Sequence, residues 1–220
     1  MTTLMTDPVA TVLQRLFDEA EAARPHTQQA VADLSDDDQE RMMTSKADYV
    51  ELYSRFRDVP LAVSRETGAL LYMLVRSTAA RSIVEFGTSF GTSTLHMAAA
   101  LHDNGGGRLI TSEFEPSKLA IARKNLAEGG LIDLVEFRAG DALQTLRTDL
   151  PDTVDLLLLD GAKALYPEVL SMVESRLGKG AFIVADNADY SPDYLAYVRN
   201  PANGYLSVPF GDDVELSMRM

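Results

Sequence analysis

Oxygen-bearing side chains stand at the ends of two apolar runs, and their types are those that bind hard metal ions. Asp160 ends the run VDLLLLD (154–160), Asp186 ends the run GAFIVAD (180–186), and Asn187 follows directly. If the runs are neighbouring strands, about 4.8 Å separates them, and the three side chains converge at one edge. Two carboxylates and an amide suit Mg²⁺ or another hard divalent cation. The alternative is that the acids cap strand ends and Asn187 forms a turn.

A glycine-containing turn supplies a second candidate site. In VEFGTSFGTSTL, Gly87 and Gly91 allow a tight turn and a close approach of the backbone to a ligand. The spacing is G-x-x-x-G, which differs from the G-x-G-x-x-G of dinucleotide enzymes, and a glycine pair alone is weak evidence. Glu113 closes the next apolar run, where nucleoside-binding sheets carry an acid for the ribose hydroxyls. A surface acid at a strand end is the alternative.

Two more acids are expected at the same edge. Glu85 precedes the glycine turn on an otherwise apolar strand. An unpaired buried charge is costly, so Glu85 should face a cleft or a polar partner. Asp141 follows a third apolar run in RAGDA, and it can cap the next helix, face the cleft, or do both.

The elements that must position these acids alternate between strands and helices. Apolar and β-branched runs predict strands at 82–86, 108–113, 134–137, 154–160 and 180–186. Helical patterns lie between them near 91–101, 116–128, 142–149 and 164–177. This rhythm predicts a doubly wound α/β fold whose mostly parallel sheet has helices on both faces. The LLLL of the fourth run fits a central strand buried on both sides.

The end of the chain departs from that rhythm. Runs at 205–210 and 214–220 predict two more strands, for seven in total, and no helix long enough for a parallel crossover separates them. They should therefore pair antiparallel through the turn at 211–213.

The first 80 residues predict helices. One should begin at Pro8 after the capping Asp7. Ser35 should cap a second helix whose apolar stripe runs over 42–56, and Ser64 a third. Without a linker or repeat, we expect a single domain over 1–220, with 1–80 packing on an α/β core at 81–220.

Composition excludes several function classes. The 20 basic residues against 33 acidic ones give a net charge of −13, and nucleic-acid binding normally requires a basic face. No apolar run approaches a membrane span, and the N-terminus lacks the features of a secretory signal. With no cysteine, the chain has no disulfide, no thiolate nucleophile and no cysteine metal site. We therefore expect a cytoplasmic protein with a small-molecule partner and no membrane or nucleic-acid partner.

The chain contains three motifs in the order VEFGTSFGTS, ITSEFEP and AGDAL. In this arrangement it resembles the class I S-adenosylmethionine-dependent methyltransferases. The tail ADNADYSPDYLAYVRN narrows the resemblance to the catechol O-methyltransferase family of metal-dependent O-methyltransferases. It covers the chain from about Val63 to the C-terminus. The resemblance implies a Rossmann-like methyltransferase fold with an antiparallel last strand.

The resemblance also implies residue roles. Lys163 corresponds to the family's general base, and Asp160, Asp186 and Asn187 to its metal ligands. The positions that correspond to cofactor-binding ones are Val63, Glu85, Gly87, Thr88, Ser93, Glu113, Asp141, Ala142 and Asp160. Family members bring a further carboxylate from the loop before the last strand. Here that loop is short, and Asp212 or Asp213 could replace it.

The implied activity is methyl transfer from S-adenosylmethionine to a hydroxyl of a phenolic or catechol-like molecule, with Mg²⁺ and a lysine base. The alternatives are a metal-independent methyltransferase of the same fold, a nicotinamide-dependent oxidoreductase, and a cofactor-binding module without catalysis. The apolar N-terminal helices could form a lid or the surface of a homodimer.

Overall fold

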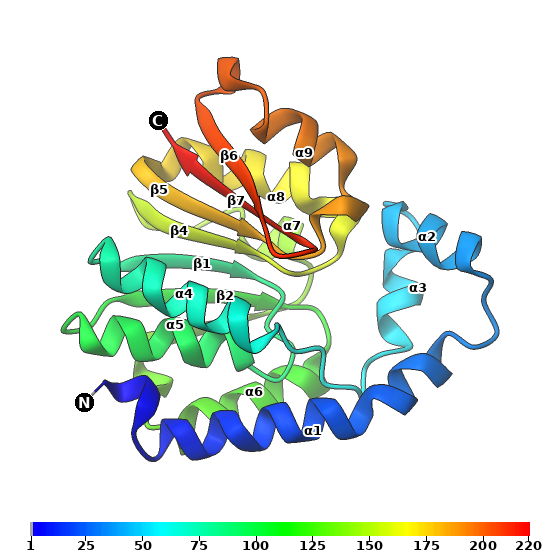
Figure 1. Ribbon diagram of the computed structural model, residues 1–220, viewed down its shortest axis with the longest axis horizontal. Coiled ribbons are helices and arrows are strands. Elements are labelled where there is room, and N and C mark those ends of the chain that lie inside the picture. Colours follow the sequence, from blue (N-terminus) through cyan, green and yellow to red (C-terminus); the bar gives the residue numbers. More distant parts are fainter. Residues whose placement is uncertain (1) are drawn as a thin grey trace.

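The computed structural model describes residues 2–220, and its centre is one seven-stranded sheet in the order β3-β2-β1-β4-β5-β7-β6 (Figure 1). The strands are β1 Ser82–Phe86, β2 Arg108–Glu113, β3 Val135–Ala139, β4 Val154–Leu159, β5 Leu177–Ala185, β6 Tyr205–Phe210 and β7 Val214–Arg219. Strands β1 to β5 are parallel, and β7 runs antiparallel to both β5 and β6. The predicted mostly parallel sheet with an antiparallel end is confirmed.

Helices cover both faces of the sheet because successive strand residues point to opposite sides. In β4, Leu156 and Leu158 pack in the cluster that contains α4 and α5, while Leu157 and Leu159 pack against α8. The helices on the first face are α4 Arg65–Ser77, α5 Thr92–Asp103 and α6 Pro116–Glu128. Those on the second face are α7 Ala142–Thr145, α8 Tyr166–Val173 and α9 Pro192–Val198.

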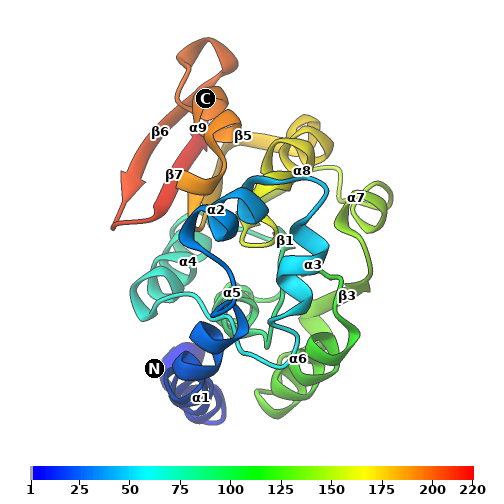
Figure 2. The same ribbon diagram turned by 90° about the vertical axis from the view of Figure 1, so that its right-hand side faces the viewer.

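The N-terminal helices reach the edge of the sheet where the parallel strands end. Helix α1, Val9–Ala30, packs on α5 and α6, and leads to α2, Asp36–Thr44, and α3, Tyr49–Ser54. Figures 1 and 2 show α2 and α3 standing over the carboxyl ends of the strands. Consistent with this, α2 contacts the short helices 163–165 and 188–190 that follow β4 and β5. Among residues 2–220, no helix is both long and apolar enough to cross a membrane.

Two N-terminal predictions need correction. The first helix begins at Val9 with Pro8 as its N-cap, and Asp7 makes no capping bond; its carboxylate accepts a hydrogen bond from the Thr11 hydroxyl instead.

The predicted second helix is two helices, although Ser35 caps it as expected by accepting a bond from the Asp38 N–H. Helix α2 ends at Thr44 because the Ser45 hydroxyl accepts bonds from the N–H groups of Ala47 and Asp48. Such side-chain bonds to the backbone compete with the helix. Ser64 caps α4, as predicted.

Two crossover helices are shorter than predicted. Helix α7 ends at Thr145, and the Arg138 guanidinium binds the carbonyl oxygens of Thr145, Thr148 and Asp149, which holds this segment out of the helix. Helix α8 spans Tyr166–Val173 rather than 164–177, and β5 begins at Leu177 rather than at 180 because residue 177 already pairs with β4.

Candidate active site

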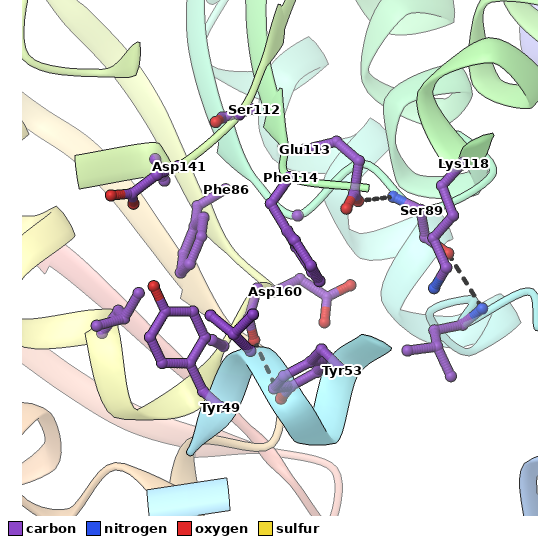
Figure 3. A pocket seen from close by; sticks show the side chains of 18 residues that line it. Tyr49, Tyr53, Phe86, Ser89, Ser112, Glu113, Phe114, Lys118, Asp141 and Asp160 are labelled. Carbon is purple, nitrogen blue, oxygen red and sulfur yellow. Dashed lines mark hydrogen bonds between the residues drawn. The ribbon is translucent and has the colours of Figure 1, made fainter. Parts of the chain in front are cut away.

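A cavity of about 280 Å³ lies at the carboxyl ends of β1, β2, β3 and β4, and so includes the point between β1 and β4 where the strand order reverses. Open α/β sheets bind ligands at this position. Figure 3 shows aromatic side chains pointing into the cavity from two sides. Phe86 is the last residue of β1 and Phe114 directly follows β2, whereas Tyr49 and Tyr53 come from α3. The volume lies near the lower end of small-molecule sites, about 300–1,000 Å³.

Gly87 allows β1 and β4 to approach each other at this cavity. Its φ is +99°, and a Cβ built there would lie 2.5 Å from the backbone oxygen of Asp160. A side chain would therefore be strained in the backbone and would push the two strand ends apart. Gly87 and Asp160, predicted from separate strands, line the same cavity.

Gly87→Ala should destabilise the protein more than Gly106→Ala. Gly106 has a similar φ of +104°, but a Cβ there meets nothing within 4 Å. We expect a loss of about 1–3 kcal/mol from backbone strain at Gly106, and a further ~1–3 kcal/mol from overpacking at Gly87. Urea unfolding of both variants measures the difference, and equal losses would contradict the close contact with Asp160.

Glu113 is held in place by the backbone. One carboxylate oxygen accepts a bond from the Ser89 N–H at 2.9 Å (Figure 3), and the other accepts one from the Glu115 N–H at 3.0 Å. Only 7% of Glu113 is exposed, and it lines the cavity. Two N–H donors orient the carboxylate and leave further lone pairs for a ligand.

Glu85 does not line the cavity. It is fully buried, and its two oxygens accept bonds from the Ser93 hydroxyl at 2.5 Å and the Thr94 hydroxyl at 2.6 Å. Burial raises the pKa of Glu85 to about 7, although the hydroxyls act in the opposite direction. The polar partner expected for Glu85 is thus the start of α5. Thr88 is buried as well, with its hydroxyl 2.5 Å from that of Thr111.

Asp141 and Ala142 both line the cavity, and Figure 3 shows Asp141 on the opposite side of it from Lys118. Asp141 caps α7 by accepting a bond from the Leu143 N–H at 2.9 Å, and it also lines the cavity. The two roles weighed for this residue are therefore compatible. Val63 lies outside this cavity and lines a neighbouring groove.

Acidic side chains and one lysine converge at the ends of β4 and β5. The Lys163 ammonium lies 3.0 Å from an Asp160 oxygen and 4.0 Å from an Asp186 oxygen. Asn187 donates to Asp213 at 3.0 Å, which leaves its amide oxygen as the acceptor. Of the two loop acids considered, Asp213 is the one that contacts this group. Within residues 2–220, no group of three or more acidic or histidine side chains is placed to hold a metal ion. The candidate ligands here are two carboxylates and one amide.

The charges in this group are strongly coupled. Burial and the Asp160 charge raise the pKa of Asp186 to about 7. Burial alone would lower the pKa of Lys163, but Tyr166, Asp160 and other neighbours outweigh it and keep that pKa well above 10.5. Two crowded carboxylates and an amide oxygen are a donor set that suits a hard divalent cation.

Several residues that line the cavity could not be predicted from a motif in the sequence. Tyr49 and Tyr53 come from a helix far from the glycine turn, and Phe114 follows Glu113 without a motif. Lys118 looks like an ordinary helix-surface lysine, yet it is 4% exposed. Burial lowers the pKa of Lys118, and the nearby negative charges of Glu113 and Glu115 act in the opposite direction.

Residues 34–201 match the model of a family described as O-methyltransferase. The catechol O-methyltransferase of Niastella koreensis is 36% identical over 130 residues, which cover 58% of each chain. Catechol O-methyltransferase B of Danio rerio is 34% identical over 174 residues, 76% of this chain and 65% of the relative. The chain thus spans less than two thirds of either relative.

A solved structure of similar fold comes from Streptomyces achromogenes. It is the O-methyltransferase TomG, involved in tomaymycin synthesis, in complex with SAM. It is 25% identical, with a TM-score of 0.63 over 91% of this chain and 98% of that one.

Proposed function

This chain belongs to the O-methyltransferase family, and from that premise we propose that it transfers a methyl group from S-adenosylmethionine to a hydroxyl of a small catechol-like acceptor, with a divalent cation. One observation carries the proposal. Asp160 lines both the cavity beside Glu113 and the groove that contains Lys163, Asp186 and Asn187. Donor and acceptor sites on the two sides of one residue are what a transfer reaction requires.

The cavity is the proposed cofactor site. Glu113, fixed by two backbone N–H groups, would accept bonds from the ribose hydroxyls. Asp141 and Ala142 would lie beside the adenine, and Gly87 beside the methionine part. Three buried residues would support the site without lining the cavity. They would hold the glycine turn and the start of α5 in place, and they are Glu85, Thr88 and Ser93. S-adenosylmethionine supplies a methyl group on a positively charged sulfonium, and acids around the cavity favour such a cation.

Asp160, Asp186 and Asn187 are the proposed cation ligands. The raised pKa of Asp186 supports this assignment, because a carboxylate that is buried, and that has the Asp160 charge beside it, keeps its own charge more easily when a positive charge lies close to both. A bound Mg²⁺ would polarise the acceptor oxygen as a Lewis acid.

Lys163 is the proposed base. Its amine could not accept a proton while Asp160 and Asp186 hold it as an ammonium. With those carboxylates engaged by a cation, the ammonium would lose its stabilising partners and release its proton to solvent, and the resulting neutral amine could accept the proton of the acceptor hydroxyl. Tyr53 and the aromatic walls would exclude water from the transfer.

Glu113→Gln should raise the dissociation constant for S-adenosylmethionine by about 10–100-fold, because a hydrogen bond to a charged group contributes about 1.5–3 kcal/mol. Calorimetry measures this directly. The matched control is Glu128→Gln, which removes the same charge from an exposed ion pair with Arg15. If the two variants bind the cofactor equally well, the ribose assignment is wrong.

One observation favours a second candidate, a metal-independent methyltransferase of the same fold. The Lys163 ammonium already contacts both Asp160 and Asp186. It could neutralise them without a metal, and chelation separates the two cases.

A further inference from the structure

A groove of about 660 Å³ adjoins the cofactor cavity and shares Asp160, Tyr53 and Leu61 with it. At one end lie Lys163, Asp186 and Asn187. The rest of its lining comes mostly from α1 and from the segment 60–66. The groove is thus continuous with the proposed site of methyl transfer, and a molecule lying in it would have one end at Lys163.

The groove exceeds what a single ring requires. Its volume falls in the range of sites for drug-sized ligands, about 300–1,000 Å³. A benzenediol whose two oxygens lie beside Asp160 and Asn187 would leave the part along α1 empty.

The distal part of the groove has an apolar wall. Phe17 lies there, and the charged Arg65 guanidinium covers part of its ring, 4.2 Å from the ring centroid. Ala20, Phe56 and Pro60 continue the same wall.

The rim of the groove carries both negatively and positively charged side chains. Arg24, for example, pairs with Glu21 at 2.8 Å. An apolar wall with a mixed rim favours an uncharged apolar group over an anion or a cation.

We propose that the acceptor is a catechol with an extended, uncharged apolar substituent. The vicinal oxygens lie at the Lys163 end, and the substituent lies along α1 toward Phe17. This inference rests on the proposed function and adds the substrate class. Because each buried methylene stabilises binding, a longer substituent should raise kcat/KM until the groove is filled.

Two acceptors with the same reacting ring test the proposal, 4-methylcatechol and 4-hexylcatechol. In the wild-type protein, we expect kcat/KM to be about 10-fold or more higher for the hexyl compound, from apolar burial alone. Ala20→Trp fills the groove, so it should bring the ratio of the two kcat/KM values close to one. Ala22→Trp, on an exposed position of α1 outside the groove, should keep the wild-type ratio.

The outcomes separate the two claims. If both acceptors are methylated with equal kcat/KM by the wild-type protein, the inference is wrong and the proposed function stands. If Ala20→Trp and Ala22→Trp change the ratio equally, the groove is not the binding site of the substituent. If neither acceptor is methylated although S-adenosylmethionine binds, the proposed function fails, and the inference fails with it. The wild-type comparison needs no variant, so it holds even if a tryptophan variant does not fold.

Discussion

Lys163→Met is expected to lower kcat by about 10²–10⁴-fold, the usual contribution of a positioned acid–base group. Methionine preserves much of the side-chain volume and removes the amine. Lys163 is 4% exposed, and its ammonium lies 3.0 Å from an Asp160 oxygen. The dissociation constant for S-adenosylmethionine should change little, because Lys163 lines the groove and not the cofactor cavity.

Two controls make this result specific. Lys179→Met removes an exposed lysine and should leave kcat unchanged. Urea unfolding of Lys163→Met shows whether the loss of the buried ion pair also destabilises the fold, and partial rescue of kcat by an added alkylamine would identify the missing group as an amine. A folded Lys163→Met variant with undiminished kcat would contradict the assignment of the base.

Removing divalent cations should have the second large effect. With a chelator present, we expect methyl transfer to fall by about 100-fold or more, the scale of Lewis-acid assistance worth several kcal/mol, and added Mg²⁺ should restore it. Without a cation, Asp160 and Asp186 hold Lys163 as an ammonium, which cannot accept a proton. Steady-state rates in chelated and Mg²⁺-supplemented buffers measure the effect.

Variants at the end of β5 test whether the divalent cation acts at the proposed ligands. Asp186→Asn should lose activity that Mg²⁺ does not restore, whereas Asp189→Asn, at an exposed position nearby, should respond to Mg²⁺ as the wild type does. Equal rates with and without chelator would instead support the metal-independent candidate, in which Lys163 alone balances the two carboxylates.

The sheet could be predicted from the sequence because its signals are local and repeated. Apolar runs such as LLLL in β4 are buried on both faces, as their composition requires. The turn after β1 also follows from its sequence, because Gly87 stands where no side chain fits. The break between α2 and α3 could not be predicted, because it depends on which backbone groups the Ser45 hydroxyl binds.

The acids at the carboxyl ends of the strands follow from topology, and for that reason Glu113, Asp141 and Asp160 are found around one cavity. The rest of the cavity depends on tertiary packing. Tyr49 and Tyr53 reach it only because α3 stands over the sheet edge (Figure 2). Glu85 was expected to face a cleft or a polar partner, and only the position of α5 decides between them.

The central claim is that this chain moves a methyl group from S-adenosylmethionine to a catechol hydroxyl. The most direct test is to incubate the wild-type protein with S-adenosylmethionine bearing a deuterated methyl group, a catechol and Mg²⁺, and to measure product masses. We predict an acceptor that gains one deuterated methyl group per molecule of S-adenosylhomocysteine formed. Tight cofactor binding with neither product formed, across simple and extended catechols, would contradict the claim.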